Sequence, residues 1–319
     1  MTNPIAQGLQ RDVATLCAGG NRTVGSDGHR AARGHLLARF REIGLAPYAG
    51  DGYELPYEVR GTRFVNVVGV AAGRSADARP VLVGAHYDTI SGTPGADDNA
   101  AAIAIALEVA GRLARAPAAR PVVIAHFDAE EPPFFHSTAM GSTRFVADQM
   151  AGAVHAAIVL DLVGHAIAVP GLEDVIGVMG SESHEALARA VGAHANAFLP
   201  MVTLANRFMP DMSDHYAFRL AGAPYLFLTC GQWRHYHRYT DTPDVLDYGK
   251  MARVADLLEA LVRNAAEAEM AGAVEHDTTA IDTEQLRRVL GPQAEVLGLR
   301  GPGDFDRVVR QVVGAIQGV

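Results

Sequence analysis

Residues 122–131 read VVIAHFDAEE, and this segment decides how the rest of the chain is interpreted. A nearly continuous apolar run of this length is typical of a β-strand that is buried on both faces of a sheet. The run leads directly into Asp128, Glu130 and Glu131, which would bring several carboxylates to one edge of the sheet. Carboxylates that lie close together repel one another and are costly to bury without a counter-charge. The segment therefore predicts a buried strand that ends at a cation-binding site.

Apolar segments of the same kind recur along the chain, with helical patterns between them. The predicted strands cover residues 64–70, 81–85, 122–127, 157–160, 175–178 and 225–228. The predicted helices cover residues 100–113, 142–150, 184–193, 214–220 and 249–266, after a helical N-terminal region that stops at Gly44. Strands that alternate with helices predict an α/β fold, here a three-layer α/β/α sandwich with a mixed, mostly parallel central sheet.

The pattern changes after Ala273, which divides the chain into a main domain of residues 1–272 and a C-terminal extension of residues 273–319. Within the extension, residues 275–283 are polar and are predicted to form a loop. Two short helical patterns follow at residues 284–290 and 305–316. We expect the extension to pack on the main domain or on a partner subunit, which would make the protein a homo-oligomer.

The composition of the 319 residues excludes several classes of partner. The net charge of −9 argues against nucleic acid, because phosphate binding needs clustered cations. No apolar stretch reaches the length of a membrane span. The chain starts without the pattern of a secretory signal, and two cysteines are too few for a disulfide scaffold, so we expect a reduced, cytoplasmic protein. Cys230 follows an apolar strand and is interpreted as a buried structural thiol rather than a nucleophile.

Two segments in the first half of the chain carry further candidate ligands. His86 closes the strand at 81–85, and Asp88 lies two residues on, where its carboxylate could hydrogen-bond the free ring nitrogen of a metal-bound imidazole. Asp97 and Asp98 stand directly before a helix, so one of them could cap that helix while the other reaches a cation above the sheet. The alternative for the first pair is a polar strand end that faces water.

Two segments in the second half complete the set. Asp161 ends another apolar strand. His235 and His237 lie in a loop before a helix, and only one of these imidazoles need be a ligand. Asp241 follows them and has an alternative use as a helix cap or a brace for the loop. Each segment is weak evidence alone, but together they place histidines and carboxylates at the ends of strands of one sheet.

The chemistry of these donors indicates the metal. Nitrogen and oxygen donors without a thiolate suit zinc, and less specifically cobalt or manganese. Two divalent ions would balance three carboxylates and one shared hydroxide. Glu130 is left next to a ligand and free to take a proton from the shared water.

The order of the motifs HYD, GADDNA, DAEE, LDLVG, SDH and YHxxxDT resembles the zinc-dependent aminopeptidases of peptidase family M28, over about residues 21–261. The resemblance implies an α/β/α sandwich and removal of an N-terminal residue from a peptide, or hydrolysis of a similar small amide. It implies that one metal is held by His86, Asp98 and Asp161, and the other by Asp98, Glu131 and His237. Glu130 matches the family's catalytic base, and Asp88 matches the partner of the first histidine. Some members have a cis peptide at the position of Asp98–Asn99, so we expect one here.

Two further comparisons keep alternatives open. Residues 132–142 replace the short turn that many members have after the glutamate pair, so we expect a reshaped pocket rim and cannot inherit a substrate preference. The residues that we expect near the substrate are Phe134, Phe135, Arg207 and Tyr236. The chain also resembles glutaminyl cyclases, which use one zinc and close pyroglutamate rings, but the pair Asp97–Asp98 favours the two-metal peptidases. A third alternative is a binding protein without activity, which the complete ligand set argues against.

Overall fold

The computed structural model describes residues 3–195 and 197–317, and its centre is one mixed sheet. Within these ranges the strands follow the order β1-β3-β5-β4-β6-β9-β7-β8, and β2 pairs with β3 outside this path. Their bounds are β1 (Ala46–Pro47), β2 (Glu54–Val59), β3 (Thr62–Ala71), β4 (Val81–His86), β5 (Val122–Phe127), β6 (Ala156–Leu160), β7 (Ile176–Met179), β8 (Met201–Leu204) and β9 (Tyr225–Thr229).

The directions of the strands determine which edge of the sheet carries the predicted metal-binding residues. The four central strands β5, β4, β6 and β9 are parallel, whereas β3 runs antiparallel to β5 and β7 runs antiparallel to β9. These central strands are buried along their whole length, as their apolar sequences predict. Because their carboxyl ends meet at the same edge, the residues that follow each of them are brought together there.

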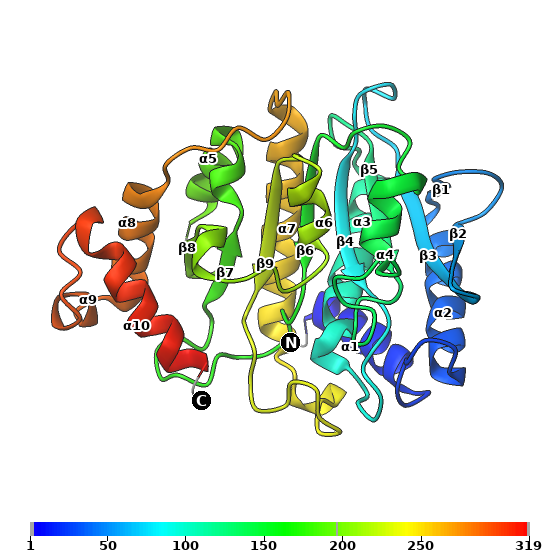
Figure 1. Cartoon of the computed structure of the whole chain (residues 1–319), viewed down its shortest axis with the longest axis horizontal. Coiled ribbons are helices and arrows are strands. Elements are labelled where there is room, and N and C mark those ends of the chain that lie inside the picture. Colours follow the sequence, from blue (N-terminus) through cyan, green and yellow to red (C-terminus); the bar gives the residue numbers. More distant parts are fainter. Residues whose placement is uncertain (1–2, 196, 318–319) are drawn as a thin grey trace.

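Helices cover both faces of the sheet, which confirms the predicted three layers (Figure 1). One face packs against α1 (Pro4–Cys17), α2 (Asp27–Ile43), α3 (Ala101–Arg115), α5 (Glu185–His194) and α7 (Tyr248–Glu267). The other face packs against α4 (Gly141–Arg144), α6 (His215–Leu220), α8 (Thr279–Leu290) and α10 (Phe305–Gln317), with the short α9 (Gln293–Val296) between the last two. α2 ends at Gly44, whose φ of 81° is the left-handed conformation that glycine adopts without cost.

The C-terminal extension continues the second helical layer beyond α6, beside β7 and β8 (Figure 1). Leu286 and Phe305 are buried and belong to the same apolar cluster as Phe227 of β9. Asp282 of α8 accepts a hydrogen bond from the hydroxyl of Thr203 in β8 at 2.5 Å. Residues of α8 and α10 therefore pack against strands of residues 1–272. The division of the chain into a main domain and an extension stays a prediction. A homo-oligomer formed through it stays a prediction.

The structure corrects the predicted elements in several places. Three strands, β1, β2 and β8, were not predicted. β1 has only two residues, and β2 is a partly exposed strand that includes a proline. The predicted loop at residues 275–283 is wrong from Thr279 onward, where α8 already begins. Polar residues form that first turn because Asp282 is buried and bonded to Thr203 and Thr278. The predicted helix at 142–150 consists of α4 and a π-helical turn, η2 (Phe145–Gln149).

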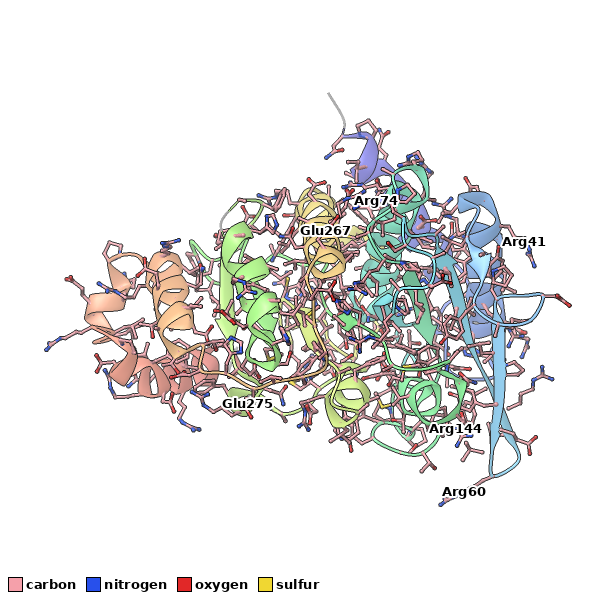
Figure 2. All side chains as sticks on the ribbon, turned by 90° about the horizontal axis from the view of Figure 1, so that it is seen from above. Arg41, Arg60, Arg74, Arg144, Glu267 and Glu275 are labelled. Atoms are coloured by element: carbon pink, nitrogen blue, oxygen red, sulfur yellow. The ribbon has the colours of Figure 1, made fainter. Side chains whose placement is uncertain are left out.

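Charged side chains lie mainly on the outer surface, where Figure 2 labels several of them. Arg74 and Glu267 form one surface ion pair there, between the segment after β3 and the end of α7. Exposed pairs of this kind contribute at most about 1 kcal/mol to stability. In the part of the chain that the structure describes, no helix is long and apolar enough to cross a membrane.

Candidate metal centre

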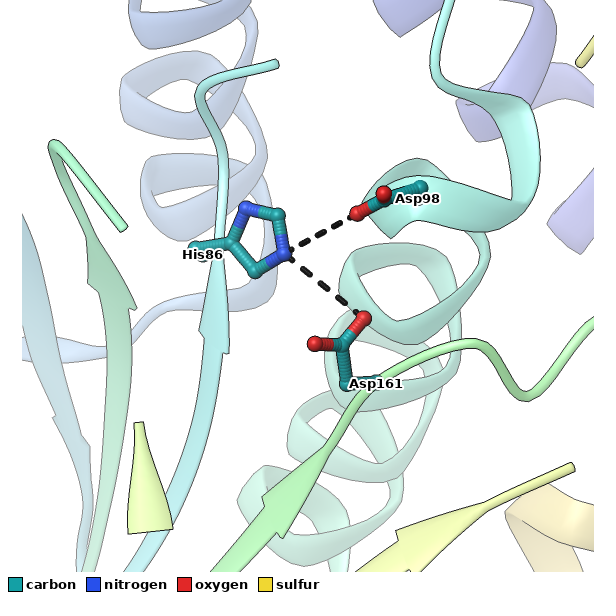
Figure 3. A group of neighbouring side chains, drawn as sticks. All are labelled: His86, Asp98 and Asp161. Carbon is teal, nitrogen blue, oxygen red and sulfur yellow. Dashed lines mark ion pairs between the residues drawn. The ribbon is translucent and has the colours of Figure 1, made fainter. Parts of the chain in front are cut away.

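The first group of donors lies where β4 and β6 end. His86 is the last residue of β4, Asp161 follows β6, and Asp98 lies in the π-helical turn η1 (Ala96–Ala100) that leads into α3. The Nε2 atom of His86 is 3.2 Å from Oδ1 of Asp98 and 3.6 Å from Oδ1 of Asp161 (Figure 3). These three side chains point toward one another and are buried. Their spacing lets a single ion take one donor atom from each.

The second group shares Asp98 with the first. His237, in the loop after β9, places its Nε2 atom 3.3 Å from Oδ2 of Asp98 and 3.1 Å from Oε2 of Glu131. The two oxygens of Asp98 therefore face the two histidines separately, Oδ1 toward His86 and Oδ2 toward His237. The structure thus brings together the whole predicted set of ligands as two groups joined by one carboxylate. The peptide between Asp98 and Asn99 is cis, which confirms that prediction.

Buried polar atoms in these groups support the fit of a metal. The atoms Nε2 of His86, Oδ1 of Asp161 and Oε1 of Glu131 are buried and have no hydrogen-bond partner among the described residues. Unpartnered buried polar atoms are rare in folded proteins and call for an explanation such as a bound ion. Imidazole nitrogens and carboxylate oxygens are the donors that zinc takes. The donor set therefore fits two divalent ions.

Two buried carboxylates fix the main chain beneath the donors. Asp88 accepts hydrogen bonds from the N–H groups of Glu130 at 3.0 Å and Glu131 at 3.1 Å. Asp241 does the same for Asp97 at 2.9 Å and Asp98 at 3.1 Å. Each of these two carboxylates thus holds a pair of adjacent residues. The second residue of each pair, Glu131 or Asp98, contributes its own carboxylate to the groups of donors. The interpretation of Asp241 as a loop brace is confirmed.

The predicted contact between Asp88 and His86 needs a correction. The Nδ1 atom of His86 lies 3.2 Å from the main-chain oxygen of Asp88, whereas the Asp88 carboxylate is 3.6 Å away. The carboxylate is too far for a hydrogen bond because its two oxygens are turned toward the main chain of residues 130–131. The imidazole is therefore oriented by a backbone carbonyl.

Asp97 does not reach the site and does not cap α3. Its carboxylate accepts a hydrogen bond from the N–H of Gly164 at 2.7 Å and lies 2.6 Å from Nδ1 of His165. His235 is likewise turned away, with its Nδ1 atom 2.8 Å from the hydroxyl of Thr240. Geometry therefore favours Asp98 and His237 as the donors at the positions where the sequence alone left a choice.

Burial and charge shift the protonation of the site strongly. Burial raises the pKa of Glu130 well above its usual value, and the nearby Asp161 and Glu131 raise it further. Burial also raises the pKa of Glu131 to about 7. Burial works to lower the pKa of His237, but hydrogen bonds to Asp98 and Glu131 outweigh it and raise that pKa to about 10. The bare cluster therefore retains protons that a divalent cation would displace.

A cavity of about 300 Å³ opens onto the donors. Phe135 and Tyr236 line it, as predicted for residues near the substrate, and so does His136. Phe134 does not, because its ring packs edge-on against Phe64 in a separate apolar cluster. Arg207 does not line it either, since its exposed guanidinium faces Asp306 of α10 at 3.4 Å. Phe134 and Arg207 thus lie outside this cavity, and the substrate roles of all four residues stay predictions.

Some residues of the site were not found from the sequence. Arg22 is completely buried and donates hydrogen bonds to the main-chain oxygens of Tyr87, Pro94 and Gly95, which fixes the segment between β4 and η1. Asp214 is also buried, and burial raises its pKa to about 7. Asp214 lies in the motif SDH, which does not say what its side chain contacts, and Arg22 lies outside the six motifs. Cys230 is a free, buried thiol, as predicted.

These features first define a class: an α/β protein that gathers histidines and carboxylates suited to divalent metals at the carboxyl ends of its parallel strands. The family follows from comparison with known sequences. The chain belongs to peptidase family M28, because the model of that family matches residues 66–262, more than half of the chain. This membership supports an enzyme that acts on peptides.

Several known proteins are similar to this chain. The Escherichia coli protein YfbL is 31% identical over 220 residues, which cover 59% of this chain and 68% of that protein. A glutaminyl cyclase from Porphyromonas gingivalis has a TM-score of 0.67 and 21% identity over 82% of this chain and 99% of its own. A Zn-dependent exopeptidase from Parabacteroides distasonis has a TM-score of 0.66 and 17% identity over 81% of this chain and 98% of its own. At such identities the two structures share the fold, and the fold alone does not separate peptidase from cyclase.

Proposed function

We propose that the protein is an aminopeptidase that uses two divalent metal ions to hydrolyse an N-terminal peptide bond or a similar small amide. The observation that carries this proposal is the position of Asp98, whose two oxygens face two separate groups of donors. A site for one ion needs no such shared carboxylate. When bound, the ions would lower the pKa of the attacking water and polarise the carbonyl of the substrate.

Glu130 is the residue that we propose as general base. Its carboxylate lies 3.9 Å from Nε2 of His86, lines the cavity, and belongs to neither group of donors. It can therefore accept the proton of the attacking water and deliver that proton to the leaving amine. Asp88 fixes its main-chain N–H, and its side chain is almost completely buried.

The test separates chemistry from metal binding. Glu130→Gln keeps the size of the side chain and removes its basicity, so turnover of aminoacyl amides should fall by at least about 100-fold. The zinc content should stay as in the wild type, because Glu130 is not among the proposed ligands. Glu284→Gln, at an exposed residue of α8, is the matched control and should leave both quantities unchanged. Wild-type rates in Glu130→Gln would refute the assignment of the base.

The same assay distinguishes the proposed peptidase from a cyclase. A glutaminyl peptide is included with the aminoacyl amides, and the products are identified by mass. Release of the N-terminal residue supports the peptidase. Formation of pyroglutamate with loss of ammonia, in a protein that binds one zinc per chain, would instead support a glutaminyl cyclase.

A further inference from the structure

The segment that follows Glu131 forms part of the wall of the metal-facing cavity, and it differs from the short turn of many family members. Two main-chain hydrogen bonds fix this segment. The N–H of Phe134 donates to the oxygen of Glu131, and the N–H of Ser137 donates to the oxygen of Phe134, both at 2.9 Å. The ring of Phe134 also packs edge-on against Phe64 of β3. His136 lies inside the second of these turns, so the main chain sets its position relative to the proposed ligand Glu131.

The ring of His136 is held between two other aromatic rings. Its centroid lies 4.0 Å from that of Phe135, with 20° between the planes, and 4.2 Å from that of Tyr216, with 30° between the planes. Two rings that are nearly parallel to a third at such distances lie on its opposite faces, because one face has no room for both. The ring nitrogens lie on the edge between these faces. That edge is accessible, since His136 is an exposed residue of the cavity lining.

The charges around the cavity favour an anionic group beside His136. Among the lining residues, only His136 and His237 can carry a positive charge, and His237 belongs to the proposed metal ligands. Asp211 is the one acid of the lining that is neither a proposed ligand nor the proposed base. Its carboxylate accepts hydrogen bonds from Arg219 at 2.8 and 2.5 Å, so its charge is already paired. An anion that binds His136 is therefore not opposed by an unpaired charge on Asp211.

A short peptide offers such an anion at its C-terminal end. In a dipeptide the carboxylate follows the hydrolysed amide by a single residue, and consecutive Cα atoms are about 3.8 Å apart. The cavity of about 300 Å³, which the metal donors and His136 both line, is of the size that holds a small ligand. A longer peptide or a peptide amide has an uncharged carbonyl at the same position. A carbonyl makes a weaker hydrogen bond than a carboxylate does.

We infer that the imidazole edge of His136 binds the C-terminal carboxylate of the substrate, so that the protein is a dipeptidase that prefers free dipeptides to peptide amides and longer peptides. This inference rests on the proposed function, because it concerns the same metal-facing cavity. A measurement of binding without turnover keeps the two apart.

The kinetic test compares leucylglycine, leucylglycinamide and leucylglycylglycine as substrates of the zinc-loaded protein. The wild type should favour leucylglycine over each of the other two by about fivefold in kcat/KM, a modest factor because solvent screens an exposed contact. His136→Gly removes the ring and suits the backbone, whose φ of 54° is left-handed. This variant should bring both ratios close to one, mainly through a higher KM for leucylglycine.

Two further variants separate the proposed contact from general effects on the loop. Arg60→Gly is the matched control, because Arg60 has a similar φ of 51° in the exposed turn between β2 and β3 (Figure 2). It should keep the preference of the wild type for leucylglycine. His136→Phe keeps an aromatic ring between Phe135 and Tyr216 but has no ring N–H, so it should lose the preference as His136→Gly does.

Binding is measured by isothermal titration calorimetry on zinc-loaded Glu130→Gln, in which we expect peptides to bind without turnover. Leucylglycine should bind about fivefold more tightly than leucylglycinamide. The double variant that also carries His136→Gly should bind the two equally.

The outcomes are distinguishable. If the wild type hydrolyses none of the peptides but binding follows the expected pattern, the proposed function fails and the carboxylate site at His136 stands. If the peptides are hydrolysed and the preference for leucylglycine is the same in the wild type, His136→Gly and His136→Phe, the inference about His136 is overturned. Equal kcat/KM for leucylglycine and leucylglycinamide in the wild type also overturns it.

Discussion

Replacing Asp88 by asparagine should weaken both the fold and the metal centre, because this buried carboxylate holds two adjacent main-chain N–H groups. Its oxygens accept from Glu130 at 3.0 Å and from Glu131 at 3.1 Å. Asparagine keeps one acceptor oxygen and turns an NH₂ group toward the other N–H. A hydrogen bond to a charged group contributes about 1.5–3 kcal/mol, and a buried donor without a partner costs about 1–3 kcal/mol. We therefore expect a loss of roughly 3 kcal/mol in the free energy of unfolding.

The same substitution should also lower the affinity for metal, because Asp88 holds the main chain of the proposed ligand Glu131. Loss of a residue that orients a ligand typically lowers metal affinity by about 10–100-fold. Urea unfolding of metal-free protein measures the first effect, and competition with a zinc chelator of known affinity measures the second. Asp77→Asn, at an exposed position, is the matched control and should change neither. A variant Asp88→Asn with the stability and zinc affinity of the wild type would show that this brace has no such role.

Three further predictions concern stability. His126 is buried, and burial lowers its pKa to about 3, below the unfolded value near 6.5. The folded state then binds fewer protons, so stability is full above pH 6.5 and is lost as the pH falls toward 3, by about 2 kcal/mol at pH 5. His126→Phe should flatten the pH dependence of urea unfolding by this amount. Lys250 is buried and donates to the main-chain oxygens of His165, Glu173 and Val175, so Lys250→Met should cost about 2 kcal/mol in the same assay. An unchanged pH dependence in His126→Phe would contradict the first prediction, and an unchanged urea midpoint in Lys250→Met would contradict the second. Chelation of the metals should lower Tm by roughly 5–10 °C, and restored zinc should recover it.

The parallel centre of the fold was predictable from the sequence because its strands are continuous apolar runs. The strand at 122–127 is predicted with its observed bounds, and its carboxylates lie at the sheet edge as expected. The edge strand β2 was not predictable in this way, since it is exposed at Glu54 and Glu58 and includes Pro56. Its pairing with β3 depends on a neighbour rather than on its own apolar pattern.

The candidate ligands were predictable for a related reason: parallel strands bring their carboxyl ends together, so the order of motifs is enough to predict a cluster. The contacts beneath the ligands were not. The sequence paired the Asp88 carboxylate with His86, whereas the structure turns it toward the main chain of residues 130–131. The position of α8 depends on a buried contact between Asp282 and Thr203, two polar residues far apart in the sequence. No local pattern encodes such a contact.

The zinc stoichiometry of the wild type and of His237→Ala tests the central claim most directly. Metal-free protein is dialysed against excess zinc, and the bound metal per chain is measured by inductively coupled plasma mass spectrometry. We expect two ions per chain in the wild type. His237→Ala should retain about one, because His237 contributes to only one of the two groups joined by Asp98. One ion per chain in the wild type, unchanged in His237→Ala, would contradict the two-metal centre.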